Sequence, residues 1–162
     1  MRCKTAHLPE HIYDVKTFRL IHVGTKSDPK VHLSSTEDIE SWPEYTTLSH
    51  RWTNATRTTQ LLWSNIQKHF VEIDTARWPV VYKQVIYVTP KIGVRYLWID
   101  SICIVQYSKD DWTEQSNLMD YVYARGVLKL SAEGGGRFNG FSMERNPLAE
   151  SPYILAQQQE ET

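Results

Sequence analysis

Cysteine is nearly absent from this sequence, since Cys3 and Cys103 are the only two among 162 residues. They lie far apart, and neither belongs to a CxxC pair or to the Cys/His spacing typical of zinc ligands. A disulfide-stabilised secreted scaffold and a zinc module are therefore excluded as explanations of the fold. We expect both side chains to be reduced thiols.

The sequence also lacks long apolar runs and an excess of either charge. No run approaches the roughly 18 apolar residues of a membrane-spanning helix, and the N-terminus has no apolar segment typical of a signal peptide. The formal net charge is -1, with both signs scattered along the chain, so no basic patch for nucleic acid or an anionic membrane is indicated. Internal repeats are absent. We expect a cytoplasmic protein that binds neither nucleic acid nor membranes.

What the sequence does contain is enough apolar material for one globular domain. Hydrophobic residues make up 41% and charged residues 23% of the chain, which is the composition of a soluble domain with a buried core. Aromatic residues reach 12%, with six tryptophans, so large rings fill either the core or a ligand cleft. Composition alone does not decide between these two places.

Alternating strand and helix patterns predict an α/β fold with a largely parallel sheet and helices on both faces. Residues 17–24 and the "VHLSS" stretch flank a Gly/Asp/Pro turn and predict an N-terminal β-hairpin. Pro90 interrupts one apolar helical stripe, so that helix should kink or end near Thr89. The remaining strands are expected at 45–52, 94–105 and 127–136, and the helices at 58–69, 79–93 and 110–125.

Polar side chains gather where three of the predicted strands end. Ligands of such sheets lie at the carboxyl ends of the strands. An arginine and an aromatic ring at such an edge suit the recognition of a phosphate and a ring system. The residues at these ends are Ser49, His50, Arg51 and Trp52 after one strand, Asp100, Ser101 and Cys103 after or within the next, and Ala132, Glu133 and Gly134 after the last.

An amide interrupts the apolar stripe of the predicted helix at 110–125. The acids and the threonine of "DDWT" suit the positive N-terminal end of a helix. Gln115 falls on the apolar face, so it is expected to point inward, either as a buried amide that bonds a backbone group or as part of a site. Helical spacing counted from Trp112 groups the following residues on that face: Gln115, Ser116, Met119, Val122 and Tyr123.

Three spaced motifs carry a resemblance to a known family. They are "YTTLSHRW" at 45–52, "RYLWIDSICIVQ" at 95–106, and "DW" at 111–112 followed by "M" at 119 and "VYARG" at 122–126. In this order they resemble the fungal heterokaryon incompatibility (HET) domain, over about residues 17–148. The resemblance implies a TIR-like, flavodoxin-like fold. It also implies one HET domain at 1–148, with a C-terminal tail or the start of a linker at 149–162.

The resemblance further implies an activity. HET proteins trigger cell death when non-self is sensed, and TIR-like domains include enzymes that cleave NAD between nicotinamide and ribose, with a glutamate on a helix as the key catalytic group. HET members usually carry a glutamate three residues after the tryptophan of "DW", where this chain has Gln115. Glu114 is a poor substitute, because it is rotated by about a hundred degrees around the helix. The chain is therefore expected to be inactive or impaired, with NAD as a substrate and not as a cofactor.

The resemblance assigns the catalytic position to Gln115. Two more residues are candidates for nucleotide binding: Trp112 either packs inward in the core or stacks on the ligand, and Arg145 either binds a diphosphate or caps the closing loop. The amide is either a natural loss of the carboxylate or an engineered Glu→Gln change, and the intact motif around it favours the second origin. The expected partners are NAD or a related nucleotide, further copies of the chain, and an upstream sensor domain or protein.

Two other interpretations stay open. A non-enzymatic module would relay the death signal by homotypic assembly, and a native Gln115 favours it. A Cys/His hydrolase would depend on Cys103 and His50, but a cysteine inside an apolar run is more often a small buried hydrophobe. His7 and His11 have the spacing of a helical metal pair, yet Pro9 lies between them, so no metal site is expected.

Overall fold

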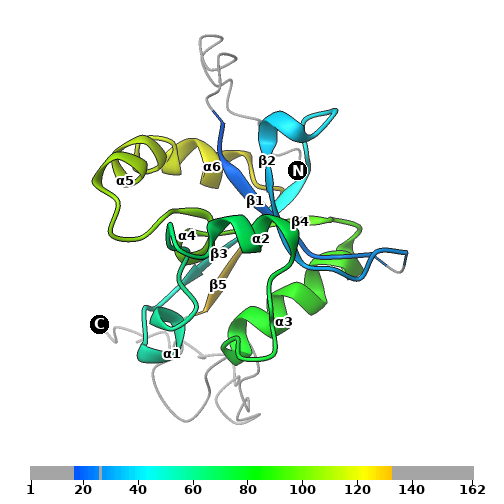
Figure 1. Cartoon of the computed structure of the whole chain (residues 1–162). Helices are drawn as coiled ribbons and strands as arrows, with labels where there is room; N and C mark the ends of the chain where they lie inside the picture. The colour runs from blue at the N-terminus through cyan, green and yellow to red at the C-terminus, as the bar shows by residue number, and fades with distance from the viewer. Residues whose placement is uncertain (1–16, 26, 133–162) are drawn as a thin grey trace, which may run out of the picture.

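The computed structural model describes residues 17–25 and 27–132, which form a sheet accompanied by short helices (Figure 1). The predicted boundary at 148 lies outside these residues. The same is true of several residues named above: Cys3, His7, His11, Glu133, Gly134 and Arg145.

Five strands form one mixed sheet in the order β2-β1-β4-β3-β5. β3 pairs in parallel with β4 and β5, whereas β1 is antiparallel to both β2 and β4. The predicted α/β class is confirmed, and the predicted hairpin, β1 with β2, extends the same sheet at one edge. The strands are β1 Arg19–His22, β2 His32–Ser35, β3 Tyr45–His50, β4 Tyr96–Ile99 and β5 Leu128–Ala132.

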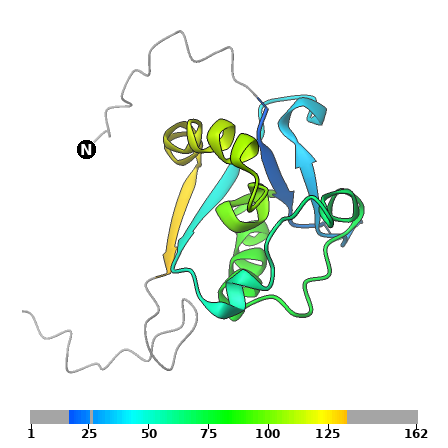
Figure 2. The same ribbon diagram turned by 60° about the vertical axis from the view of Figure 1, so that its left-hand side comes forward.

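The helices are short, and α3 lies well apart from the α5 and α6 pair when Figures 1 and 2 are compared. Within the described part of the chain, every helix is too short or too polar to cross a lipid bilayer. The α-helices are α1 Asn54–Arg57, α2 Ile66–Val71, α3 Val80–Val88, α4 Asp100–Cys103, α5 Lys109–Ser116 and α6 Met119–Arg125, and the 3-10 segments are η2 Thr36–Asp38 and η3 Thr89–Ile92.

The irregular end predicted near Thr89 is confirmed. α3 stops at Val88, and the chain continues as the 3-10 turn η3 with Pro90 in its first turn. Gly93 then closes this turn with φ 83°, a left-handed conformation that glycine adopts without a steric penalty. Pro90 is tolerated there because the backbone no longer follows the α-helical hydrogen-bond pattern.

The single helix predicted at 58–69 is wrong in its first half. Leu61 N donates to the Ser101 carbonyl oxygen, and Gln106 N donates to the Leu61 carbonyl oxygen. Asn65 Oδ1 also accepts from Leu62 N at 2.9 Å. These bonds hold the segment as turns beside α4, so only the part that forms α2 is helical, and the separate short helix α1 lies before the predicted start.

Two further predicted elements are divided. The apolar run at 94–105 leaves the sheet after Ile99 and turns into α4, so Asp100 is the first residue of a helix. The helix predicted at 110–125 breaks after Ser116 into α5 and α6. Apolar periodicity alone could not locate these ends, since the buried residues continue past Ile99 and the spacing from Gln115 to Val122 is still helical.

The central strands carry most of the core. Leu97, Trp98 and Ile99 of β4 are almost completely buried, and so are the first four residues of β3. Tyr45 Oη donates to the Val122 carbonyl oxygen at 2.8 Å, which joins the start of β3 to α6. This buried sheet holds the ends of β3 and β4 in fixed positions.

Gly126 permits α6 to approach β3 closely. A Cβ atom added there would lie 2.9 Å from Thr47 Cγ2. We expect Gly126→Ala to lower the free energy of unfolding by about 1–3 kcal/mol, because the methyl group overpacks a filled core. Urea denaturation measures this loss. In a Thr47→Ser background, which removes Cγ2, the same change should cost much less, and an equal cost in both backgrounds would contradict the explanation.

Candidate functional site

The carboxyl ends of β3 and β4 lie side by side. Leu48 of β3 is in register with Ile99 of β4, so the residues that follow each of them emerge at the same edge of the sheet. His50 ends β3, and Asp100 and Ser101 begin α4. The predicted gathering of polar residues at this edge is therefore found in the structure.

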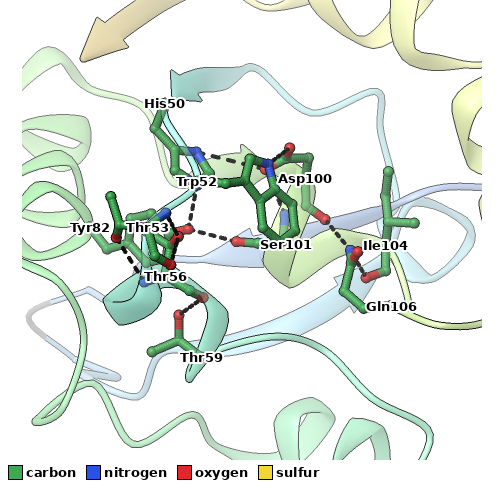
Figure 3. A network of polar contacts seen from close by, with 10 residues as sticks. All are labelled: His50, Trp52, Thr53, Thr56, Thr59, Tyr82, Asp100, Ser101, Ile104 and Gln106. Atoms are coloured by element: carbon green, nitrogen blue, oxygen red, sulfur yellow. Dashed lines mark hydrogen bonds and ion pairs between the residues drawn. The ribbon is translucent and has the colours of Figure 1, made fainter. Parts of the chain in front are cut away.

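Asp100 is the carboxylate of a polar network at this edge (Figure 3). Its Oδ2 accepts from the indole Nε1 of Trp52 at 3.1 Å, and its Oδ1 accepts from the backbone N of Ser101 at 2.7 Å. Oδ1 also lies 3.7 Å from Nδ1 of His50, whose ring stacks on that of Trp52 with the centroids 6.1 Å apart. The carboxylate is thus held in place on one side while remaining partly exposed.

Tyr82 connects the histidine to the serine. Its Oη lies 2.7 Å from His50 Nε2 and 2.7 Å from Ser101 Oγ. One arrangement of protons satisfies this series of hydrogen bonds. Ser101 donates to Tyr82, Tyr82 donates to His50 Nε2, and the proton on His50 Nδ1 faces Asp100. The sequence prediction missed Tyr82 because it lies on the apolar face of α3, although a buried tyrosine hydroxyl usually needs a partner.

Burial governs the protonation of this network. It lowers the pKa of His50, while the Asp100 carboxylate acts in the opposite direction. It also raises the pKa of Tyr82, which the hydrogen bond to Ser101 partly offsets. The imidazole is therefore neutral and the phenol protonated near neutral pH, in agreement with the proton arrangement above.

Cys103 is a buried thiol and does not belong to this network. Its side chain is fully buried, and burial raises its pKa to about 12. A thiol that keeps its proton is a weak nucleophile. The structure therefore gives no support to a Cys/His hydrolase built on Cys103 and His50.

Three partly buried histidines are expected to make the fold less stable in mild acid. Burial is the main cause that lowers the pKa of His22, His50 and His69 below the ordinary value of 6.5. The unfolded chain then binds more protons than the folded chain below about pH 6.5, so the stabilisation is complete above that pH and declines as the pH falls. Urea denaturation at about pH 7.5 and about pH 5.5 measures the decline. NMR titration midpoints at or above that of a free imidazole would contradict the explanation.

A cavity of about 270 Å³ adjoins the network through His50. It lies at the carboxyl ends of β3 and β5, because Arg51 and Ala132 also line it. The rest of its wall is mostly apolar and comes from α1, the start of α3 and the loop before it: Thr53, Ala55, Thr56, Arg77, Trp78, Pro79, Val80 and Val81. An apolar cavity beside a few polar groups is a suitable shape for a small molecule.

Gln115 points inward, as its spacing predicted, but it lies outside the network of Figure 3. Its side chain is 5% exposed, and Nε2 donates to the Thr17 carbonyl oxygen at 3.2 Å. One turn earlier, Asp111 is also buried and pairs with Arg19. The inward face of α5 is thus formed by Asp111 and Gln115, whereas Trp112 is 47% exposed.

The candidate residues therefore fall into separate groups. His50, Trp52, Asp100 and Ser101 come together with Tyr82, and Arg51 lines the neighbouring cavity. Ser49 is exposed on β3, and Trp112 and Gln115 lie on α5 away from the drawn network. Within residues 17–25 and 27–132, no three His, Cys, Asp or Glu side chains are grouped so as to hold a metal ion.

Comparison with known proteins identifies the family of this chain. No curated protein and no solved structure matches the chain. The family model described as "Heterokaryon incompatibility protein (HET)" matches residues 45–161, which include β3, β4, the polar network and α5. This match covers most of the chain and begins at the first residue of β3, where the first of the three motifs begins. The chain belongs to the heterokaryon incompatibility (HET) family.

Proposed function

We propose that this chain is a HET cell-death effector whose site derives from an NAD glycohydrolase and is impaired by Gln115. Family membership supports a role in heterokaryon incompatibility. The observation that carries the proposed chemistry is the network of His50, Asp100 and Tyr82 beside a small-molecule cavity at the carboxyl ends of parallel strands.

The proposed reaction breaks the bond between the ribose C1′ and the nicotinamide nitrogen. A water oxygen then bonds to C1′ and loses a proton, which gives nicotinamide and ADP-ribose. The transition state carries positive charge on the ribose ring, so a nearby carboxylate stabilises it. Asp100 is the carboxylate of the network, and its bonds to Trp52 and Ser101 fix its direction. In this proposal it holds the ribose.

Gln115 explains why the activity would be weak. An amide has nearly the shape of a carboxylate but no negative charge, so it can hydrogen-bond but cannot stabilise a cation. Its Nε2 donates to the Thr17 carbonyl oxygen, a contact that an ionised carboxylate cannot make. A glutamate at this position would need to take up a proton or turn away from Thr17.

The release of nicotinamide from NAD tests this proposal. We expect Gln115→Glu to release nicotinamide faster than the unaltered chain, because it restores a carboxylate on the inward face of α5. Thr113→Glu is the matched control, since it adds the same charge at an exposed position about two hundred degrees around the same helix. Equal rates for all three proteins, with the variants folded, would contradict the proposal.

A second candidate function is a non-enzymatic module that relays the signal by self-association. The hydrogen bond from the buried Gln115 amide to Thr17 favours it, since the amide then has a structural role that needs no substrate. In that case Gln115→Glu destabilises the fold and releases no nicotinamide. Light scattering of the concentrated chain would then show oligomers that do not depend on NAD.

A further inference from the structure

Two cavities meet at Arg77 and Trp78. The first is the cavity of about 270 Å³ beside His50. The second has a volume of about 170 Å³, and most of its lining residues have polar side chains, so we call it the polar cavity: Thr58, Thr59, Gln60, Asn65, Lys68, His69, Ile73 and Asp74. Arg77 and Trp78 line both cavities, so the two cavities are neighbours and the exposed Arg77 borders each of them.

The walls of this pair of cavities are positively charged, although the chain as a whole has a net charge of -1. Arg51, Arg77 and Lys68 contribute three positive charges and Asp74 one negative charge, which leaves an excess of two. None of the three cations has an ion pair with another described residue. Asp74 is already engaged, since its Oδ1 accepts from Ala76 N at 2.9 Å.

His69 adds an unsatisfied group to the polar cavity. It lines that cavity, and its Nδ1 is buried without a hydrogen-bond partner among the described residues. Burial lowers its pKa, and the charge of Lys68 lowers it further. A bound anion would oppose both causes, so its arrival should favour the protonated ring.

The sizes of the cavities limit the ligand. The apolar cavity lies slightly below the range of about 300–1,000 Å³ that is usual for small-molecule sites. A ligand that fills it with a ring must therefore either be small or extend beyond it. The neighbouring polar cavity, which Arg77 also borders, offers such an extension, and its positive charge and hydrogen-bond donors suit phosphate oxygens.

From these features we propose that the two cavities form one binding site for a nucleoside diphosphate, with the base in the apolar cavity and the phosphates between Arg77 and Lys68. The proposal rests on the proposed function, because NAD, the proposed substrate, contains such a diphosphate. Trp78 links the site to the network, because its ring contacts that of Tyr82 edge to face at a centroid distance of 5.6 Å.

Calorimetric titration of the full chain with ADP and with adenosine tests the inference. We expect ADP to bind at least about tenfold more tightly than adenosine, since charge-assisted bonds to phosphate add to the contacts of the base. Arg77→Gln and Lys68→Gln should each weaken ADP binding by about five- to twentyfold and leave adenosine binding unchanged. Arg57→Gln is the control, because this exposed arginine of α1 lines neither cavity.

NMR of His69 provides a second readout that does not depend on affinity. Saturating ADP should raise the titration midpoint of its imidazole, and adenosine should leave it unchanged. The inference is overturned if adenosine binds as tightly as ADP, if neither binds, or if Arg77→Gln and Arg57→Gln bind ADP equally well.

The outcomes for this inference and for the proposed function are separable. ADP binding that depends on Arg77, in a protein whose Gln115→Glu variant releases no nicotinamide, would support the site and refute the hydrolase. Nicotinamide release by Gln115→Glu that is unaffected by adding Arg77→Gln and Lys68→Gln would refute the site and leave the hydrolase.

Discussion

The free energy of unfolding of an Arg19→Met variant is expected to be about 3–5 kcal/mol lower than that of the unaltered chain. Arg19 Nη2 lies 2.7 Å and 2.6 Å from the two carboxylate oxygens of Asp111, and the two side chains are only 14% and 8% exposed. Arg19 Nε also donates to the Cys103 carbonyl oxygen at 2.7 Å. One guanidinium therefore joins β1 to the end of α4 and to α5.

The cost arises because removal of the arginine leaves Asp111 buried with an uncompensated charge. Asp111 Oδ2 still accepts from Val105 N at 2.7 Å, but one neutral bond does not balance a carboxylate away from water. Urea denaturation measures the loss. Arg57→Met, at an exposed arginine, is the matched control and should change stability by less than about 0.5 kcal/mol.

A double variant separates charge from packing at this position. Arg19→Met combined with Asp111→Leu removes both charges, so much of the lost stability should return, as is often found when a buried ion pair is replaced by apolar side chains. A loss below about 1 kcal/mol for Arg19→Met would show that the pair acts as a solvent-exposed salt bridge, contrary to its burial.

Adding Asp100→Asn to the Gln115→Glu variant is expected to reduce nicotinamide release by about a hundredfold. Asn retains an acceptor oxygen for Trp52 Nε1 or Ser101 N but removes the negative charge beside His50. His50 then loses the group that favours a proton on Nδ1, so the direction of the Tyr82 hydrogen bond is no longer fixed. The effect should fall on kcat more than on KM.

Asp110→Asn is the control for this change. Asp110 is an exposed carboxylate in the first turn of α5, so Asp110→Asn removes one negative charge, as Asp100→Asn does, but leaves the network unchanged. Thermal unfolding of both variants shows whether the fold is intact. If Asp100→Asn and Asp110→Asn reduce the rate equally, the network has no part in the reaction.

The sequence predicted the strands and the polar edge because both depend on local patterns. The runs that form β3 and β4 are apolar and β-branched, and polar residues follow each of them directly. The order of the strands was not predictable, because the pairing of β1 with β4 joins residues far apart in the chain. The local sequence of the hairpin does not indicate which strand β1 will pair with.

Errors occurred where tertiary hydrogen bonds override local periodicity. Leu61 exchanges backbone bonds with the segment around α4, which prevents the first half of the predicted helix. Trp112 was expected inward with Gln115, but Asp111 takes the inward position because Arg19 neutralises it. A charged residue is assigned to the surface by pattern alone, and its partner 92 residues away is visible only in the structure.

Chromatography of a reaction that contains NAD and concentrated Gln115→Glu protein tests most directly whether the edge formed by β3 and β4 derives from an NAD-cleaving site. NAD, nicotinamide and ADP-ribose are measured in the same samples over time. The proposal predicts that NAD is consumed and that nicotinamide and ADP-ribose appear in equal amounts. Undiminished NAD in the presence of folded Gln115→Glu protein, even when the protein is clustered, would contradict it.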